Sequence, residues 1–388
     1  MTGHTAHVVV IGGGIAGTSA ALALHKAGIS VTVCEAHPGS AGDLGAFLTL
    51  AGNGMRALDA IDAATVISEV GFDLTELSAL GADGVPLTTR PMGEPDHPLY
   101  RFRCLRWSAL TSALQAEAVR RGIPLRHDAT FVSAIQDASG VTASFADGSR
   151  ITADLLLGAD GINSRVRRIV DPQAATPRYA GQRVFYGYTS TAQPPTAPGR
   201  ITMVRGQAAS FGYAVSPAGE TFWFARQSAA AVTETGPATA ALRHELLEAL
   251  RWDSTPTADI VEATDDLLVT NTSDLPDVTT WSRGRLLLTG DAAHAASPAT
   301  GQGASMAFED AVVLAKALRD SDSVNQAITL FERVRMPRTQ RNMEASAAMT
   351  GRGTPPPAQS PTSPTSQDTE LLRQMDWNAP LTPTPTSS

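Results

Sequence analysis

The chain of 388 residues is long enough to bury a large core and to form two or three folding units. Hydrophobic residues make up 43% of it and charged residues 18%, as in ordinary globular proteins. A formal net charge of −8, without any block of like charges, argues against nucleic acid or an anionic membrane as a partner. Two cysteines, Cys34 and Cys104, support neither a disulfide framework nor a zinc site, which predicts a reduced protein of the cytoplasm without a metal.

The pattern of the chain predicts neither a secretory signal nor a membrane-spanning segment. The first residues lack a basic segment, and the apolar run at residues 7–13 is too short for a signal peptide. No window reaches the roughly 18 uninterrupted apolar residues of a membrane helix. We therefore expect no integral membrane segment, and either a monomer or a homodimer.

The N-terminal part of the chain predicts a βαβ unit. Three consecutive segments have the patterns of a buried strand, a helix and a second strand: residues 7–13, 15–27 and 29–35. Gly28 is placed to end the helix, since glycine adopts the left-handed conformation found after helix C-termini.

The rest of the chain alternates between helix and sheet patterns. Further helices are predicted over residues 53–69, 107–121, 240–252, 302–320 and 323–349. Pro337 is expected to interrupt the last of them. Residues 172–270 predict an antiparallel sheet, and a meander with a hairpin turn at Asp147 and Gly148 precedes it. Residues 285–291 return to the buried-strand pattern.

The C-terminal segment from residue 351 onward is rich in proline, serine and threonine, which predicts disorder. Within it, residues 368–377 have the spacing of a short amphipathic helix. A disordered tail with a chance apolar cluster is the alternative.

A glycine-rich turn joins the first strand to the first helix. Gly12, Gly14 and Gly17 match G-x-G-x-x-G. The first permits a tight turn, the second lets the backbone approach a pyrophosphate, and the third lets helix and strand pack closely. Glu35, about 20 residues on at the end of the second strand, is placed to accept hydrogen bonds from a ribose diol. The pattern predicts a bound dinucleotide and does not separate FAD from NAD.

A second glycine-rich loop lies late in the chain. A strand ends in Gly290 and Asp291, and the loop after it reaches a helix through Gly301, Gln302 and Gly303. An aspartate at a strand end can hydrogen-bond a polyol, and a helix N-terminus suits the negative charge of a reduced flavin. One extended FAD, held at its ADP end by the first turn and at its ribityl-flavin end by the second, accounts for both.

With these motifs, the sequence resembles the group A flavoprotein monooxygenases, whose type member is p-hydroxybenzoate hydroxylase. Three motifs carry the resemblance over roughly residues 6–350: GGGIAG with Glu35, LLLGADGINSRVR, and GDAAHAASPATGQGASMAFEDA. The resemblance implies an α/β fold, in which a Rossmann-like FAD-binding domain of glutathione reductase type carries an inserted antiparallel-sheet substrate domain.

The domains implied by the resemblance are discontinuous along the chain. Residues 1–75, 98–172 and 271–350 are assigned to the FAD-binding domain. Residues 76–97 and 173–270 are assigned to the substrate-binding sheet domain, and residues 351–388 to the disordered tail.

The resemblance also implies roles for individual residues. Asp160 lies near the FAD pyrophosphate, Asp291 binds the ribityl chain, and Pro298 lies beside the isoalloxazine. Arg106, or its neighbour Trp107, matches an arginine that contacts FAD. The full expected cofactor-binding set is Gly12, Gly14, Ile15, Ala16, Gly17, Glu35, Arg106, Asp160, Gly161, Gly290, Asp291, Pro298, Gly301, Gln302 and Gly303.

The implied reaction uses a nicotinamide reductant and O2. FAD is reduced by NADH or NADPH and reacts with O2, and the resulting flavin C4a-hydroperoxide passes one oxygen to the substrate. No Arg or Lys occurs from residue 36 to residue 55, which leaves the choice of NADH or NADPH open. The predicted sheet contains a concentration of aromatic residues: Tyr186, Tyr188, Phe211, Tyr213, Phe222, Trp223 and Phe224. Because side chains alternate along a strand, about half of these seven are expected to face a pocket. They favour an apolar aromatic, polyketide or isoprenoid substrate, from secondary metabolism or catabolism.

The sequence names no catalytic base. Residues 172–227 contain no histidine, and Arg205 and Arg226 are the most useful charges there. The catalytic candidates are Pro298, His294 and Arg226, and for His294 a structural or cofactor-lining role is favoured. Hydroxylation stays open, as do a Baeyer–Villiger oxidation and epoxidation, which needs no base. The alternatives are an FAD-dependent reductase or desaturase that does not use O2, and a non-catalytic flavin-binding protein.

Overall fold

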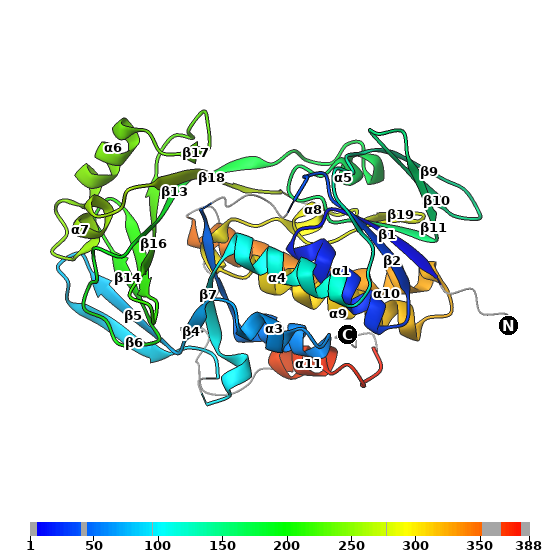
Figure 1. The fold of residues 1–388 in the computed structure, drawn as a ribbon, viewed down its shortest axis with the longest axis horizontal. Coiled ribbons are helices and arrows are strands. Elements are labelled where there is room, and N and C mark those ends of the chain that lie inside the picture. Colours follow the sequence, from blue (N-terminus) through cyan, green and yellow to red (C-terminus); the bar gives the residue numbers. More distant parts are fainter. Residues whose placement is uncertain (1–5, 40–44, 95, 277, 351–365, 382–388) are drawn as a thin grey trace.

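The computed structural model describes residues 6–39, 45–94, 96–276, 278–350 and 366–381 (Figure 1). A six-stranded sheet lies at the centre of one half of the molecule, in the order β19-β20-β12-β1-β2-β8. Its strands are β1 (His7–Ile11), β2 (Ser30–Cys34), β8 (Leu125–Arg126), β12 (Leu155–Gly158), β19 (Ser282–Arg283) and β20 (Leu286–Leu288). All neighbours pair in parallel except β19 and β20.

The predicted βαβ unit is confirmed. Strands β1 and β2 are parallel, and α1 (Ile15–Lys26) connects them. The helix ends as expected at Gly28, whose φ is +77° and whose N–H donates to the carbonyl of His25. Because this sheet is covered on both faces, its strands carry nearly continuous apolar sequences.

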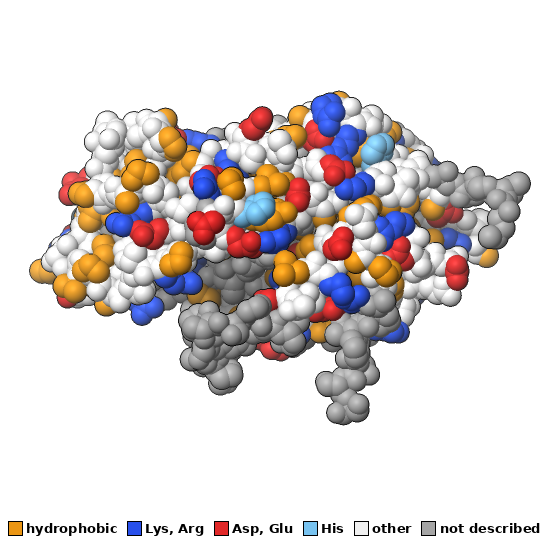
Figure 2. Space-filling view, turned by 90° about the horizontal axis from the view of Figure 1, so that it is seen from below, with side chains coloured by type: hydrophobic (Ala, Val, Ile, Leu, Met, Phe, Trp, Pro, Cys, Tyr) orange, Lys and Arg blue, Asp and Glu red, His pale blue; other side chains and the backbone are white. Residues whose placement is uncertain are grey.

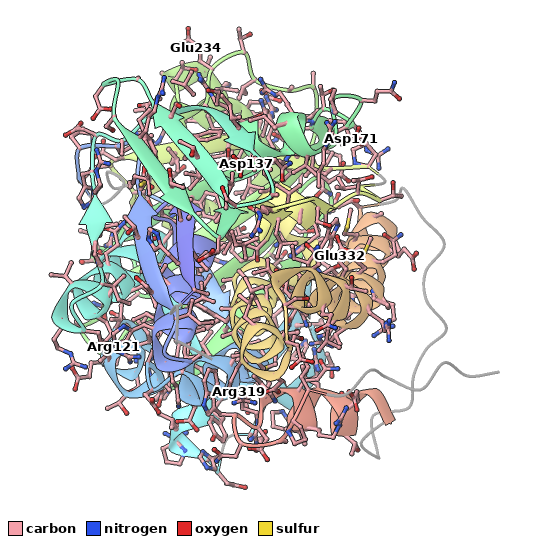
Figure 3. All side chains as sticks on the ribbon, turned by 90° about the vertical axis from the view of Figure 1, so that its right-hand side faces the viewer. Arg121, Asp137, Asp171, Glu234, Arg319 and Glu332 are labelled. Atoms are coloured by element: carbon pink, nitrogen blue, oxygen red, sulfur yellow. The ribbon has the colours of Figure 1, made fainter. Side chains whose placement is uncertain are left out.

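Helices and a small meander cover the two faces of the parallel sheet. One side holds α1, α4 (Trp107–Arg120), α9 (Gly303–Asp320) and α10 (Val324–Met349). The other side holds the meander β9 (Phe131–Gln136), β10 (Val141–Phe145) and β11 (Arg150–Ala153), with α5 (Arg165–Val170) nearby. Figure 3 shows Asp137 of the meander on one side of the sheet, and Arg319 of α9 on the other. The expected hairpin turn joins β10 to β11, with Gly148 at a φ of +81°.

A second, eight-stranded sheet forms the other half of the molecule, in the order β17-β18-β13-β16-β15-β14-β5-β6. Its strands are β5 (Glu76–Gly81), β6 (Pro86–Pro91), β13 (Arg178–Thr189), β14 (Arg200–Arg205), β15 (Ser210–Val215), β16 (Thr221–Ser228), β17 (Gly236–Pro237) and β18 (Leu267–Asp274). Only β14 and β5 pair in parallel. Helices α6 (Ala240–Leu250) and α7 (Thr257–Glu262) pack on one face. The expected α/β fold class is confirmed, whereas the division into domains stays a prediction.

Another three-stranded sheet, besides the meander, lies between these halves. Its order is β3-β7-β4, with β3 (Phe47–Leu50), β4 (Phe72–Leu74) and β7 (Phe102–Arg106). The remaining elements are α2 (Gly52–Ala60), α3 (Ala64–Ser68), α8 (Asp291–His294), α11 (Ser366–Met375) and two short 3-10 turns, η1 (Pro98–Tyr100) and η2 (Pro298–Thr300).

Two expectations for helices were wrong. The segment 53–69 is not one helix but α2 and α3, because Asp62 between them has a left-handed φ of 58° that no helix accommodates. Pro337 does not interrupt α10, which continues through it. Arg335 and Thr339, on either side of the proline, are fully buried, and this packing outweighs the hydrogen bond that proline removes.

Of the two interpretations left open for residues 368–377, the helix is confirmed as α11 (Ser366–Met375), and the disordered alternative is wrong there. Residues 351–365 and 382–388 lie outside the described residues. Helix α11 packs against α9 and α2. The ammonium of Lys316 is fully buried and donates to the carbonyls of Gln374 (2.8 Å) and Asp376 (2.5 Å) at the end of α11. Arg319 donates to the carbonyl of Trp377 (2.6 Å). Long-range packing with two cations therefore orders a segment whose composition alone favours disorder.

The surface carries mixed charges, and the two cysteines lie in the interior. Figure 2 shows basic and acidic side chains interspersed over one face. Cys34 and Cys104 are both buried and free of disulfides. Within the described ranges, none of the helices combines the length and apolar character that crossing a membrane requires. The cytoplasmic location stays a prediction.

Candidate active site

A cavity of about 720 Å³ lies between the parallel sheet and the antiparallel sheet. Gly14 of the first glycine turn and Gly301 of the second both line it, so the two turns face one space. The predicted site residues on its wall are Gly14, Ile15, Ala16, Gly161, Arg226, Asp291, Pro298, Gly301, Gln302 and Gly303. Seven predicted residues do not line this cavity: Gly12, Gly17, Glu35, Arg106, Asp160, Gly290 and His294.

The glycines of the wall leave room for a group to approach the backbone. A Cβ atom added at Gly14, Gly161 or Gly303 would meet no atom within 4 Å, so each position opens onto free space. Gly12 and Gly17 require glycine for a different reason, which is the conformation and packing of the backbone. Gly12 has a φ of +104°, and a Cβ at Gly17 would lie 1.9 Å from the Gly12 carbonyl oxygen. The first set fits the close approach of a long dinucleotide, and the second lets the turn and helix pack.

Two side chains hold the first glycine turn in place. Glu35 accepts a hydrogen bond from the Gly13 N–H through Oε2 (2.6 Å) and another from the His37 N–H through Oε1 (2.9 Å). On the other side, Gln115 of α4 donates to the Gly13 carbonyl (2.7 Å). Sequence reasoning missed Gln115, because nothing in the helix pattern distinguishes it from a surface glutamine.

Asp160 caps the N-terminus of helix α5, which follows it in the chain. Its carboxylate accepts from the hydroxyl of Ser164 (2.5 Å) and from the backbone N–H groups of Arg165 (2.7 Å) and Val166 (3.2 Å), at the start of α5. Arg167 of the same helix donates to the carbonyl of Ala292 (3.0 Å). The second motif is thereby tied to the third, and Gly161 is presented on the cavity wall.

Asp291 opens onto the cavity at the start of α8. Although its side chain is accessible from the cavity, protein atoms surround the site, and this burial raises the pKa of the Asp291 carboxyl. His294 opposes that shift, and Asp310 adds to it. The carboxyl is thus well placed to hydrogen-bond a polyol that enters the cavity.

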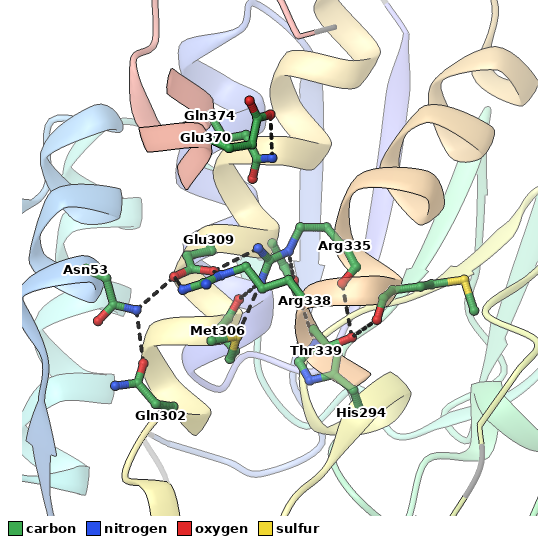
Figure 4. Close-up of polar contacts among 12 residues, drawn as sticks. Asn53, His294, Gln302, Met306, Glu309, Arg335, Arg338, Thr339, Glu370 and Gln374 are labelled. Atoms are coloured by element: carbon green, nitrogen blue, oxygen red, sulfur yellow. Dashed lines mark hydrogen bonds and ion pairs between the residues drawn. The ribbon is translucent and has the colours of Figure 1, made fainter. Parts of the chain in front are cut away.

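His294 lies behind the wall, in a buried cluster of polar groups (Figure 4). One oxygen of Asp310 accepts from His294 Nε2 (2.6 Å) and from the Gly290 N–H (3.1 Å). The other oxygen accepts from Arg335 Nε (2.7 Å). Burial acts to raise the pKa of Asp310, but His294 and Arg335 outweigh it and hold the pKa well below its usual range. The structural role favoured for His294 fits this position.

The same cluster reaches the cavity through Asn53. Its side-chain amide donates to Gln302 on the wall (3.0 Å) and to Glu309 (2.8 Å). Glu309 also accepts from Arg335 (2.8 Å) and from Arg338 (2.5 Å). We name the set Asn53, His294, Glu309, Asp310, Arg335 and Arg338 the loop-anchoring cluster, because it fixes both ends of the second glycine loop.

Arg106 does not reach the cavity. Its guanidinium pairs with Glu220 (2.8 Å) and lies 3.6 Å from the ring centroid of Tyr188, on the antiparallel sheet. Trp107, the neighbour considered for the same role, lines the cavity instead. At a strand–helix junction the side-chain direction changes from one residue to the next, and pattern matching does not resolve such a step.

The antiparallel sheet turns one face toward the cavity. Tyr186 and Phe224 line it, and Tyr188 and Phe222 lie on the same face, packed around Phe47. The alternate positions point the other way, into the core beneath α6 and α7: Phe211, Tyr213 and Trp223. The aromatic residues therefore divide between the two faces, and two of the seven reach the cavity wall.

Arg226 of β16 and Arg90 of β6 are the charged residues of the sheet that line the cavity. Arg226 lies at the cavity end of β16, and its Nη2 donates to the carbonyl of Pro298 on the opposite loop (2.9 Å). Its Nε is buried without a hydrogen-bond partner among the described residues. Burial lowers the pKa of Arg226, and Tyr186 beside it opposes the shift.

Comparison with known proteins shows the family. A model of an FAD binding domain matches residues 5–346, so the chain belongs to this family of flavoproteins, whose group A members the sequence resembles. Aurachin C monooxygenase/isomerase of Stigmatella aurantiaca is 28% identical over 341 residues, covering 85% of each chain. The 3-amino-4-hydroxybenzoate 2-monooxygenase of Streptomyces cremeus is 30% identical over 353 residues, covering 87% of this chain and 85% of the relative.

Solved structures share the fold. HpxO of Klebsiella pneumoniae, solved with FAD and uric acid, has a TM-score of 0.81 and 24% sequence identity, over 97% of this chain and 94% of that chain. The family resemblance predicted from the three motifs is confirmed by the family match and by these relatives. The chain is thus an FAD-binding protein of the monooxygenase family.

Proposed function

We propose that the protein is a monooxygenase that uses FAD, NADH or NADPH, and O2 to hydroxylate or epoxidise a small apolar molecule. The observation that carries the proposal is the single cavity, which both glycine turns line and which continues to an apolar face of the antiparallel sheet. Aromatic compounds, polyketides and isoprenoids are the substrates that such a face favours.

The described residues fit FAD along the cavity. Gly14 and Gly161, with open space in place of side chains, would accept the pyrophosphate next to the N-terminus of α1. Asp291 would bind the ribityl chain, and the backbone at Pro298 and at residues 301–303 would lie along the isoalloxazine. Bound FAD supplies the redox chemistry, taking two electrons from the nicotinamide and activating O2, so that one oxygen goes to the substrate and one to water.

The protein's own part is to position and to exclude water. The apolar residues of the sheet face, including Met203 and Phe224, remove water from the space beside the second glycine loop. The loop-anchoring cluster holds Gly290 and Gln302 in fixed positions, so that the groups on this loop are preorganised. None of these roles requires a catalytic base, which agrees with the lack of histidine on the sheet strands from residue 172 to residue 227.

The test is to purify the protein and to measure bound flavin, nicotinamide oxidation and oxygen uptake. We expect a yellow protein whose oxygen uptake accompanies NADH or NADPH oxidation, with ¹⁸O from ¹⁸O2 entering the product of an apolar aromatic or isoprenoid substrate. Equal turnover without O2 would select the reductase or desaturase instead. Flavin binding without any nicotinamide oxidation would select the non-catalytic flavin-binding protein.

The single variant that tests the site is Asp291→Ala. We expect it to lose bound FAD or to slow turnover sharply, because a carboxylate facing the cavity is removed. Flavin content after purification and nicotinamide oxidation rates measure the effect. Asp266→Ala is the matched control, because Asp266 is exposed and does not line the cavity. Unchanged flavin content and rate in Asp291→Ala would refute its assigned role.

A further inference from the structure

The start of helix α2 lies unusually close to its neighbours. Gly52 and Gly54 flank Asn53 there. A Cβ atom added at Gly52 would lie 2.7 Å from the carbonyl oxygen of Tyr100. One added at Gly54 would lie 2.6 Å from the hydroxyl oxygen of Ser305, in α9. Glycine on both sides therefore permits this close approach, which brings the side chain of Asn53 to α9.

The direction of the Asn53 amide is fixed by Glu309. The amide nitrogen of Asn53 donates to Glu309 Oε1 (2.8 Å). Burial acts to raise the pKa of Glu309, but Arg335 and Arg338 outweigh it and hold the pKa below its usual value. The ionised carboxylate accepts hydrogen bonds and donates none. The part of the Asn53 amide that faces it is therefore the N–H2 group and not the carbonyl oxygen.

The same N–H2 group fixes the direction of Gln302. The Asn53 nitrogen lies 3.0 Å from Gln302 Oε1 (Figure 4). Because a donor faces this atom, it is the carbonyl oxygen of the Gln302 amide, and the amide nitrogen is turned away from Asn53. Gln302 is the N-cap residue of α9, yet its side chain makes no cap hydrogen bond. Among the described residues its Nε2 has no acceptor, so Gln302 keeps a free N–H2 group.

This free donor belongs to the cavity wall. Gln302 lines the cavity, whereas Asn53 does not. It lies within residues 301–303, the part of the second glycine loop assigned to the isoalloxazine. The basic residues among the described residues of the wall are Arg90 and Arg226, which both belong to the antiparallel sheet. On the loop side, negative charge on a bound group is therefore met by neutral donors such as this amide.

We propose that Asn53 is a positioning residue that turns the N–H2 group of Gln302 toward the isoalloxazine of FAD, where it stabilises the negative charge of the reduced flavin. The contacts from Glu309 through Asn53 to Gln302 then make the second glycine loop bind reduced FAD better than oxidised FAD. The inference rests on the proposed function only in placing the isoalloxazine beside residues 301–303. It involves neither the nicotinamide nor O2.

The midpoint potential of the bound flavin, measured by anaerobic titration of the FAD-loaded protein, tests the proposal. The variants are Gln302→Met, Gln302→Glu, Asn53→Ala and the double variant Asn53→Ala/Gln302→Met. Gln340→Met is the matched control, because Gln340 is exposed, donates to Glu344 and does not line the cavity. For a variant that holds FAD weakly, the dissociation constants for oxidised and reduced FAD give the same comparison.

The variants at position 53 are expected to fold. Glu309 keeps its hydrogen bonds from Arg335 and Arg338 when the Asn53 side chain is removed, so no buried charge loses all its partners. Asn53→Ser, which leaves a hydroxyl group, replaces Asn53→Ala if that variant does not fold. FAD content and thermal stability are measured on every variant.

We expect Gln302→Met to lower the preference for reduced over oxidised FAD by about 10-fold, or about 30 mV for a two-electron couple, because a hydrogen bond to a charged oxygen is lost. Gln302→Glu should lower the potential further, since a carboxylate then faces the same charge. Asn53→Ala should lower it less, because Gln302 keeps an amide without a fixed direction. The double variant should match Gln302→Met, since Asn53 acts through Gln302. Gln340→Met should leave the potential unchanged.

Three results would overturn the proposal. They are an unchanged potential in Gln302→Met, a raised potential in Gln302→Glu, and additive shifts in the double variant, which would show that Asn53 acts independently of Gln302. The proposed function fails separately. Oxygen uptake coupled to nicotinamide oxidation, with equal potentials in all variants, refutes only this inference. The expected shifts in a protein that oxidises neither NADH nor NADPH refute only the function.

Discussion

The two walls of the cavity treat buried charge in opposite ways. Behind the second glycine loop, Glu309 and Asp310 meet Arg335 and Arg338, and each carboxylate oxygen has at least one donor. On the sheet side, the Nε of Arg226 is buried and has no hydrogen-bond partner in the described part of the chain. The first wall is complete within the protein itself, as a rigid support for a permanent cofactor requires, whereas the second wall keeps a buried donor that no described residue satisfies.

Among the changes that test this difference between the two walls, Asp310→Asn is expected to have the largest effect. The change keeps the shape but removes a buried charge that faces Arg335 and holds the Gly290 N–H. Removing one partner of a buried ion pair costs about 3–5 kcal/mol. We expect this loss in the free energy of unfolding at pH 7, together with weaker FAD binding, measured by urea denaturation and by flavin content. Asp266→Asn, on the exposed surface, serves as the control and should change neither.

The pH dependence of the same variant checks the cause. The pKa of Asp310 lies well below its usual range in the folded protein, so its contribution is fully present above the pKa of an unfolded aspartate, about 3.9. The contribution is lost as the pH falls below that value. The difference in unfolding free energy between the wild type and Asp310→Asn should therefore be constant at neutral pH and shrink below about pH 4. A difference that stays constant through this range would show that the charge is not its source.

Lys316 is another buried cation, and its hydrogen bonds are accepted by backbone carbonyl groups rather than by carboxylates. Lys316 donates to the backbone carbonyls of Gln374 and Asp376 at the end of α11. Lys316→Met keeps the apolar stem and should weaken the docking of residues 366–381 by about 1–3 kcal/mol, the scale for charged hydrogen bonds. Hydrogen exchange of α11 measures this. Flavin content should not change, since Lys316 is not part of the cavity wall. Unaltered exchange in α11 would mean that apolar packing alone holds the segment.

The smallest expected effect is at the first glycine turn. Glu35→Ala removes the acceptor that holds the Gly13 N–H and is expected to reach the ribose of FAD. FAD binding should weaken by on the order of 1–3 kcal/mol. Glu35→Gln, which keeps an acceptor oxygen, should lose less. Titration of the apoprotein with FAD gives both values, and an affinity unchanged in Glu35→Ala would reduce Glu35 to a strand-end residue that only shapes the turn.

Features with local backbone requirements were determined by the sequence alone. A tight turn at Gly12, a close helix contact at Gly17 and a helix end at Gly28 depend on neighbours along the chain, so their spacing in the sequence carries the information. The βαβ unit, the two glycine loops and the family resemblance all rest on such features. Most predicted cofactor-binding residues on these loops accordingly lie on the wall of one cavity.

Only the tertiary structure decided which side chains meet across the chain. Examples are the partner of Arg106, the docking of α11 onto Lys316, the continuity of α10 through Pro337 and the burial of Arg226 Nε, which all depend on contacts between segments far apart in the sequence. Side-chain direction changes with every residue of a strand, and burial depends on what packs above it. Composition and spacing therefore indicated which residues could act, while packing determined which of them face the cavity.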